Sequence, residues 1–131
     1  MTEPLWLKRQ WVDAIHFRQL QRFGGLHGVR DANLIESALA RPQNLWTYGE
    51  IRSISILAAA YGFGLVKNHG YLDGNKRVGF VAVVAFLEIN GWSFDADEAE
   101  VARIIREVAE GTLVEPDFEN WVQSHSSPID P

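Results

Sequence analysis

Two almost uncharged segments, residues 51–66 and 78–87, constrain the fold of this chain more than any other feature. Arg52 is the one charged residue that they contain. A segment that is apolar on all sides has to be buried on all sides, so both are expected at the centre of the molecule. The Val and Phe content of residues 78–86 permits a strand, but the length of the run and the stop signal Asn90-Gly91 favour a helix. We therefore predict two central helices.

The segment between them, residues 69–77, reads His-Gly-Tyr-Leu-Asp-Gly-Asn-Lys-Arg. It ends where the second central helix is expected to begin, and a helix start presents unpaired backbone N–H groups and the positive end of the helix dipole. Lys76 and Arg77 add two positive charges there. Such an arrangement binds anions, and phosphate is the usual one. With a histidine and an aspartate in the same loop, the segment predicts a site for phosphoryl or nucleotidyl transfer.

The other segments also have helical patterns, which predicts an all-α fold of a single domain spanning residues 1–131. Its core is expected at about residues 8–123, and residues 124–131 are expected to form a frayed polar tail. The expected helices cover residues 8–22, 32–40, 51–67, 75–89, about 95–110, and 115–125, with Asp31 and Asp95 as N-caps. Gly24-Gly25 and Pro42 are expected to end the first two, and residues 43–50 to form a loop or a short hairpin.

Composition and charge exclude several classes of protein. The chain has no cysteine, which rules out disulfides and thiolate metal sites. Its formal net charge is −5 and it has no run rich in Lys and Arg, which disfavours direct nucleic-acid binding. The first ten residues lack the order of a secretory signal, and the apolar run 54–66 is too short to span a membrane. A cytoplasmic protein without membrane contact is therefore expected.

His69 and Asp73 are the candidate catalytic and metal-binding groups of the loop. Histidine is the side chain that ordinarily exchanges protons near neutral pH, so His69 suits a general base that takes a proton from an attacking hydroxyl. The alternative is that it only caps the preceding helix. The carboxylate of Asp73 suits Mg²⁺, which phosphoryl donors carry and which prefers one or two carboxylates plus phosphate oxygens. An Asx-turn that shapes the loop is compatible with that role.

The end of the loop supplies the candidate phosphate-binding residues. Asn75, Lys76 and Arg77 open the second helix, where cations oppose the dipole and are tolerated more readily if an anion binds. Gly74 lets a ligand approach the backbone closely. Lys67 and Asn68 precede the loop and complete the candidate nucleotide-binding set. The position of Lys67 at a helix C-terminus explains it equally well.

Three residues outside the loop have open interpretations. His16 stands among apolar neighbours in the first helix, which favours a buried histidine with its hydrogen bonds satisfied. Trp46 and Tyr48 lie just before a central helix. They are either a flap that clamps a ligand or residues that pack their loop onto the body.

The loop resembles the motif of the Fic/Doc (Fido) family, and in particular its death-on-curing branch, whose pattern is His-x-Phe-x-Asp-Gly/Ala-Asn-Lys-Arg. His69, Asp73, Gly74, Asn75, Lys76 and Arg77 stand in the matching places. Gly70 replaces a frequent proline and Tyr71 replaces the phenylalanine, with its ring expected to pack under the loop. Similarity also covers residues 15–16, 23–25, 28–31, 36–43, 86–87 and 90–91.

The resemblance implies a compact helical bundle and an ATP-dependent transferase. Most members of the family transfer AMP from ATP to a hydroxyl side chain. The death-on-curing branch resembles a protein kinase instead, and transfers the γ-phosphate to a threonine of elongation factor Tu, which arrests translation. By this resemblance His69 is the base, Asp73 the Mg²⁺ ligand, and Asn75, Lys76 and Arg77 bind the phosphates. Lys76 replaces a glycine of the AMP-transferring members, so the two loops are not expected to hold the same pair of phosphates.

The resemblance also implies control by another protein. Family members are inhibited by a helix of pattern Ser/Thr-x-x-x-Glu-Gly/Asn or by a separate antitoxin. Glu110-Gly111 and Glu119-Asn120 lack the Ser or Thr four residues earlier. A cognate antitoxin, with a short disordered C-terminal segment that folds on the toxin, is therefore expected. The rival interpretations are a protein adenylyltransferase and an inactive module that binds a nucleotide or a partner.

Overall fold

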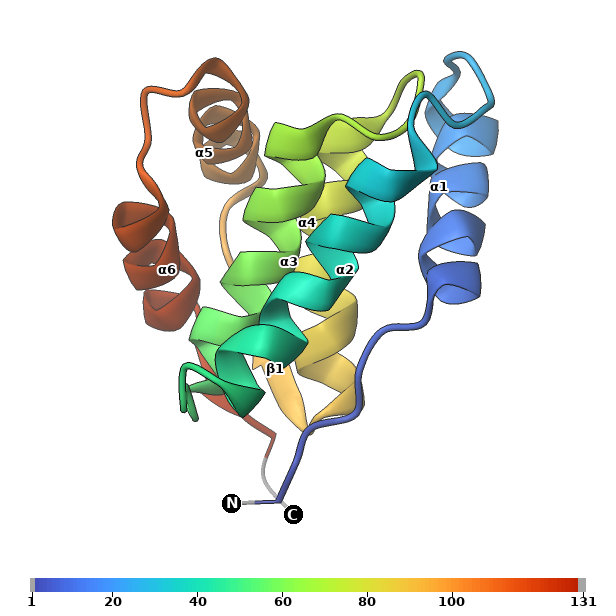
Figure 1. Ribbon diagram of the computed structural model, residues 1–131. Coiled ribbons are helices and arrows are strands. Elements are labelled where there is room, and N and C mark those ends of the chain that lie inside the picture. Colours follow the sequence, from blue (N-terminus) through green and yellow to red (C-terminus); the bar gives the residue numbers. More distant parts are fainter. Residues whose placement is uncertain (1, 130–131) are drawn as a thin grey trace.

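Helices α3 (Ile54–Asn68) and α4 (Asn75–Ile89) lie at the centre of the structure, a computed structural model that describes residues 2–129 (Figure 1). The two central helices and the all-α class are thus confirmed. The other helices within this range are α1 (Arg9–Phe23), α2 (Ala32–Thr47), α5 (Glu98–Glu110) and α6 (Glu115–Ser124). Two short strands, β1 (Trp92–Phe94) and β2 (Ser126–Pro128), pair antiparallel. In Figure 1, α1 flanks the centre on one side, and α5 and α6 flank it on the other.

Glycines bring α3 and α4 unusually close together. A Cβ atom built on Gly62 would lie 2.4 Å from Val83 Cγ2 and 3.1 Å from the carbonyl oxygen of Gly79. A Cβ atom on Gly79 would lie 2.5 Å from Val66 Cγ2 and 3.0 Å from the carbonyl oxygen of Gly62. Only hydrogen fits at these two positions, so the backbones of the two helices touch directly. This contact fixes the spacing of the two helix ends that the polar loop joins.

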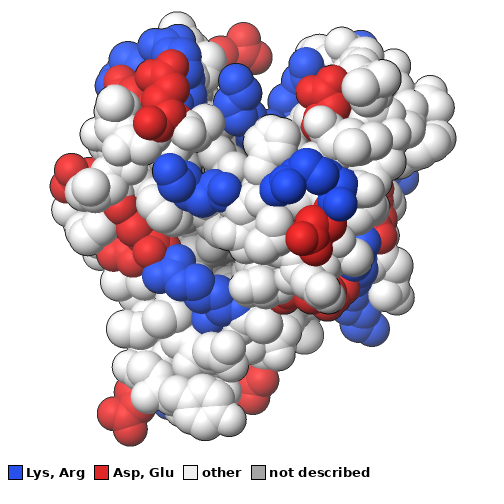
Figure 2. Space-filling view, turned by 45° about the horizontal axis from the view of Figure 1, so that its top comes forward, with Lys and Arg blue, Asp and Glu red and all other residues white. Residues whose placement is uncertain are grey.

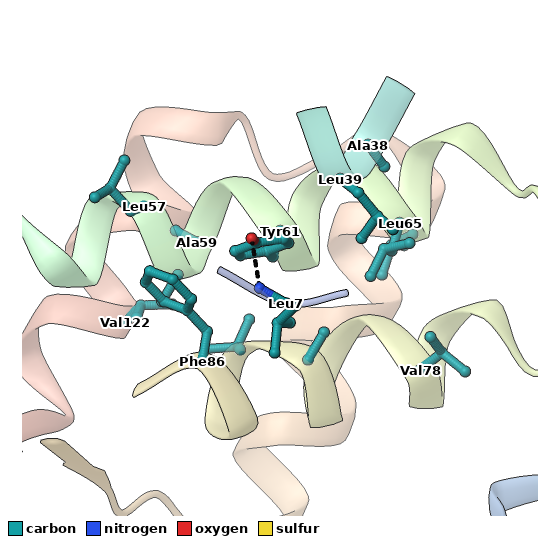
Figure 3. Close-up of a cluster of buried hydrophobic side chains, with 14 of the residues drawn as sticks. Leu7, Ala38, Leu39, Leu57, Ala59, Tyr61, Leu65, Val78, Phe86 and Val122 are labelled. Atoms are coloured by element: carbon teal, nitrogen blue, oxygen red, sulfur yellow. Dashed lines mark hydrogen bonds between the residues drawn. The ribbon is translucent and has the colours of Figure 1, made fainter. Parts of the chain in front are cut away.

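The hydrophobic core surrounds α3 and includes residues that precede α1. Leu7 is buried, and its backbone N–H donates to the hydroxyl of Tyr61 at 3.0 Å (Figure 3). Burial raises the pKa of Tyr61 to about 12, so the phenol stays protonated. Phe86 packs against the Tyr61 ring and stacks on Trp6, with centroids 5.0 and 5.8 Å away. Within residues 2–129, none of the helices has the length and apolarity that crossing a membrane requires.

The prediction that Pro42 ends the second helix is wrong, because α2 continues to Thr47 with Pro42 inside it. Proline removes one backbone hydrogen bond from a helix, which by itself favours a stop. Here the last turn carries Trp46, which is only 9% exposed and meets the Trp6 ring edge-on at 6.3 Å. Arg52 lies over the Trp46 ring at 4.0 Å and donates to its carbonyl oxygen. Packing of this turn outweighs the local effect of proline.

The prediction of a frayed tail is wrong for residues 124–129; residues 130–131 lie outside the described part. Residues 126–128 form β2, and the N–H of Ile129 donates to the carbonyl oxygen of Gly91 at 2.9 Å. The partner strand β1 occupies residues 92–94, so α5 begins only at Glu98, after Asp97 rather than at Asp95. Strands of only three residues carry little sequence signal, which explains both errors.

Candidate functional site

The polar loop between α3 and α4 lines an open cavity of about 420 Å³. Both ends of the loop have left-handed backbone: His69 has φ 52° at the end of α3, and Gly74 has φ 78° before α4. The lining includes all the residues predicted from the sequence except Asn68: Lys67, His69, Asp73, Gly74, Asn75, Lys76 and Arg77, together with Val66 and Ala109. The fold therefore gathers nearly the whole predicted set in one place.

The start of α4 provides the anion-binding part of this cavity. Val78 makes the first backbone bond of the helix, to the carbonyl oxygen of Gly74 at 3.0 Å. The backbone N–H groups of Asn75, Lys76 and Arg77 have no acceptor among the described residues. Three free donors and the positive helix end coincide with two exposed cationic side chains. This arrangement can hold a phosphate group.

Two of the cations have neighbours that fix where they lie. Arg77 donates to the carbonyl oxygen of Gly24 at 3.3 Å, and its guanidinium lies 5.1 Å from the Phe23 ring, at the end of α1. The ammonium of Lys67 lies beside Gly111, the C-terminal cap of α5, 3.4 Å from where a Cβ atom would stand. A cation is favourable at the C-terminus of a helix. Lys67 therefore bridges α3 and α5 on the wall of the cavity.

Asp73 holds the loop together and still faces solvent. Its Oδ2 accepts from the N–H of Leu26 at 3.2 Å, and its Oδ1 accepts from the N–H of Gly74 at 2.9 Å. These two backbone donors lower the pKa of Asp73 below its ordinary value, so the group is a carboxylate at neutral pH. An exposed carboxylate has about four acceptor sites, and two of them remain for a cation. The turn-forming role and the metal-binding role are compatible.

Asn75 is buried and its carboxamide is used entirely by the loop. Its Oδ1 accepts from the N–H of Tyr71, and its Nδ2 donates to the carbonyl oxygen of Tyr71, both at 3.0 Å. Its exposed fraction is 4%. Asn75 can therefore offer a phosphate its backbone N–H, while its side chain fixes the loop. Asn68 is similar, since its Nδ2 donates to the carbonyl oxygen of Leu34 in α2.

Tyr71 packs under the loop, as the sequence predicted, and connects it to α1. Its ring is 2% exposed and stacks on the imidazole of His16, with centroids 3.9 Å apart. Its hydroxyl donates to Asp13 at 2.6 Å, and Asp13 pairs with Arg9 at 3.0 Å. Burial and the bond to Asp13 raise the pKa of Tyr71, which keeps the hydroxyl a donor. The loop thus rests on a polar network of α1.

His16 contributes the second contact between α1 and the loop. Its Nε2–H donates to the carbonyl oxygen of Asp73 at 2.8 Å, because a carbonyl group only accepts. The histidine is 5% exposed, so the prediction of a buried histidine with satisfied hydrogen bonds is confirmed. The peptide that it holds joins Asp73 to Gly74, directly before the free N–H groups of α4. Sequence reasoning did not connect His16 with the loop.

Residues 25–31 form the third support, also missed as a group from the sequence. The N–H groups of Arg30 and Asp31 donate to the carbonyl oxygen of Gly70, at 2.8 and 2.9 Å. The Arg30 side chain donates to the carbonyl oxygens of His69 and Asn68, at 2.7 and 3.1 Å. A cation at the end of α3 is favourable for its dipole. Arg30 holds the backbone of His69 and leaves its side chain exposed.

Basic side chains border a notch at this end of the molecule, although the whole chain is acidic. In Figure 2 they gather on both sides of a central notch, between the lobe that carries α5 and the lobe that carries α1. The formal net charge of the whole sequence is −5. The positive charges on both sides of the notch attract anions to it. A larger hollow of about 630 Å³, lined by Leu5, Trp11 and Glu36 among others, includes no residue of the loop. Its two cationic lining residues are Lys8 and Arg9, and Arg9 is paired with the carboxylates of Asp13 and Glu36.

Comparison with known proteins places the chain in a family. A family model described as the Fic/DOC family matches residues 6–87, which is more than half of the chain and includes the whole loop. The chain belongs to the Fic/DOC family. Its relatives include the Toxin Doc of Mycolicibacterium smegmatis, 41% identical over 83 residues, and the Protein kinase doc of Escherichia phage P1, 33% identical over 86 residues.

These matches cover part of each protein. They span 60% and 65% of this chain, and 64% and 68% of the two relatives. Membership of the Fic/DOC family, as the loop motif predicted, is thereby confirmed. Both relatives carry the name Doc, in agreement with the resemblance to the death-on-curing branch. Helices α5 and α6 lie beyond the residues that the family model matches.

Proposed function

We propose that this protein is the toxin of a toxin–antitoxin system and transfers the γ-phosphate of ATP to a threonine or serine hydroxyl of elongation factor Tu. One observation carries the proposal. An exposed imidazole, an exposed carboxylate and a helix start with free N–H groups and two cations line a single cavity. The names of the two relatives, a toxin and a protein kinase, agree with this chemistry.

His69 is the general base in this proposal. Arg30 and the end of α3 hold its backbone, and its exposed side chain lines the cavity. A hydroxyl of another protein can therefore reach the imidazole and give up its proton as it attacks phosphorus. In-line attack requires the phosphates to be held at a fixed place, which is the role of the α4 start.

The residues present fit a magnesium nucleotide. Lys76, Arg77 and the free N–H groups of α4 bind the phosphates, and Lys67 and Gly74 border them. Asp73 would offer one carboxylate to Mg²⁺, an ion that prefers one or two carboxylates together with phosphate oxygens and water. Within residues 2–129, no three His, Asp or Glu side chains converge into a metal cage, which suits an ion that arrives with its nucleotide. Magnesium supplies neutralisation of charge on the transferred phosphate.

Lys76 favours phosphate transfer over AMP transfer. It follows Asn75 at the helix start and lines the cavity. A glycine at this position leaves bare amides, whereas a lysine adds bulk and a positive charge. The phosphates are therefore held differently from those in the AMP-transferring members, in keeping with transfer from the γ end.

We further propose a cytoplasmic protein held inactive by a cognate antitoxin. Neither Glu110-Gly111 nor Glu119-Asn120 has the Ser or Thr of an internal inhibitory helix. An antitoxin whose short disordered C-terminal segment folds onto the toxin would provide the control. Elongation factor Tu, the proposed substrate, is itself cytoplasmic, and no direct contact with nucleic acid or membrane is needed.

The test is the intact mass of elongation factor Tu after incubation with this protein and Mg-ATP labelled at the α or the γ phosphate. The proposal predicts the gain of one phosphate and of the γ label, and no gain with a His69→Asn protein. Gain of one AMP with the α label would establish an adenylyltransferase instead. An unchanged mass, with ATP bound, would favour an inactive binding module.

A further inference from the structure

A second hollow adjoins the loop cavity and shares two of its residues. It has a volume of about 420 Å³ and lies between α4 and α5. Its cationic lining residues are Lys76, Arg77 and Arg106, and its apolar ones are Phe80, Val101, Ala102 and Ile105. Lys76 and Arg77 thus separate the two hollows and face both of them. We refer to the second hollow as the α4–α5 groove.

The groove has the composition of a site for a flat, uncharged group attached to an anion. Phe80 follows Arg77 by one turn of α4, so its ring lies just beyond the phosphate-binding cations. Ile105 is buried beneath, while Ala102 and Arg106 are exposed at the rim. Arg106 approaches Glu110 only at 3.9 Å, with both side chains 57% exposed. An exposed pair at that distance leaves the guanidinium available.

We propose that the α4–α5 groove holds the base and ribose of the nucleotide whose phosphates occupy the loop cavity. The inference rests on the proposed function and extends it to α5, which lies beyond the residues that the family model matches. Continuity decides the assignment: a molecule with phosphates on Lys76 and Arg77 can pass between them into an apolar hollow of ligand size. Phe80 and Arg106 offer an aromatic and a guanidinium face for a purine.

The same lining predicts little selection among bases. Lysine and arginine side chains only donate hydrogen bonds, and the other four lining residues are apolar. Adenine needs an acceptor for its amino group to be recognised, which Asn or Gln usually supplies. Guanine presents only acceptors on its O6 and N7 edge, which arginine can satisfy. We therefore expect GTP to bind at least as tightly as ATP.

Calorimetric binding of ATP, GTP and inorganic tripolyphosphate, each with Mg²⁺ and without a protein substrate, tests the inference. The variant Ala102→Trp fills the groove from an exposed position on α5 and removes no core contact. Ala99→Trp makes the same change one turn earlier, at an exposed residue outside the groove lining, and serves as the control. Thermal unfolding of both variants establishes that the fold is kept.

We expect Ala102→Trp to weaken the binding of ATP and of GTP at least tenfold and to change the binding of tripolyphosphate less than twofold. The affinities of Ala99→Trp should equal those of the wild type. Unchanged nucleotide binding in Ala102→Trp would overturn the inference and leave the proposed function standing. An equal loss of affinity for all three ligands in Ala102→Trp would also overturn the inference. ATP binding tenfold tighter than GTP would contradict the donor-only groove. Failure of the wild type to bind any of them would overturn the proposed function as well.

Discussion

Residues 69–77 contain two sets of side chains with opposite tasks. The inner set is buried and satisfied by the protein itself, and consists of Gly70, Tyr71 and Asn75. The outer set faces the cavity and solvent, and consists of His69, Asp73, Lys76 and Arg77. The two sets are interleaved along the chain: the exposed His69 precedes the buried Gly70, and the buried Asn75 precedes the exposed Lys76.

The comparison teaches how a short loop can be both rigid and reactive. The inner residues, with His16 and Arg30, fix the backbone through hydrogen bonds, and the outer side chains remain available for a ligand. Stability and chemistry should therefore respond to different substitutions. We therefore consider substitutions in the outer set, in the inner set and in the supporting residue His16.

The largest effect is expected for His69→Asn. Asparagine tolerates the left-handed backbone of this position, so the change removes the base and little else. Phosphate transfer to the protein substrate should fall by about 10²–10⁴-fold, while the free energy of unfolding stays within about 0.5 kcal/mol. Single-turnover kinetics and urea unfolding measure the two quantities. A variant that transferred phosphate at the wild-type rate would remove His69 from the mechanism.

The adjacent pair Asn75→Ala and Lys76→Ala separates the two sets most sharply. Asn75→Ala leaves the N–H and carbonyl groups of Tyr71 without partners, which should cost about 1–3 kcal/mol of unfolding free energy for each group. Lys76→Ala should leave stability unchanged or raise it by about 0.3–1 kcal/mol, because a cation leaves a helix N-terminus. The affinity of the Lys76→Ala variant for tripolyphosphate should fall.

Urea unfolding and calorimetry of both variants provide the comparison. Equal destabilisation by the two substitutions would show that the division into inner and outer residues is wrong.

A smaller effect is expected from the support that His16 gives to the loop. His16→Phe keeps a ring against Tyr71 and loses the hydrogen bond to the carbonyl oxygen of Asp73, worth about 0.5–1.5 kcal/mol. His16→Gln keeps a donor and loses the stacked ring. We expect weaker tripolyphosphate binding in the Phe variant and near-normal binding in the Gln variant, measured by calorimetry. The reverse order would show that packing, and not this hydrogen bond, orients the helix start.

The smallest effect is expected for Asp73→Asn, and it concerns how the free energy of unfolding depends on pH. The folded pKa of Asp73 lies below the ordinary value of 3.8, so its contribution to stability is fully present above pH 3.8 and is lost as pH falls through the folded pKa. Asp73→Asn should therefore be less stable than the wild type at pH 7. The difference should shrink below pH 3.8. Urea unfolding at pH 7 and at acid pH tests this, and a difference independent of pH would refute the assigned role of the carboxylate.

Sequence patterns predicted the parts of this site that depend on local chemistry. The apolar runs placed α3 and α4, and the charges of residues 69–77 marked the helix start between them. The supports were missed because they come from far along the chain, as with His16, 57 residues before Asp73. No local pattern shows that the Asn75 carboxamide faces Tyr71 instead of solvent. The prediction that Pro42 ends α2 is wrong for the same reason, because the packing of Trp46 outweighs the local effect of the proline.

The most direct test of the account is the response of the individual backbone amides to Mg-ATP in two-dimensional NMR spectra. The account predicts that the largest chemical-shift changes occur at the amides of Asn75, Lys76 and Arg77, with the imidazole of His69 also affected and Ala99 unaffected. Saturable chemical-shift changes centred on the hollow near Leu5 and Trp11, without any change at the start of α4, would contradict the account.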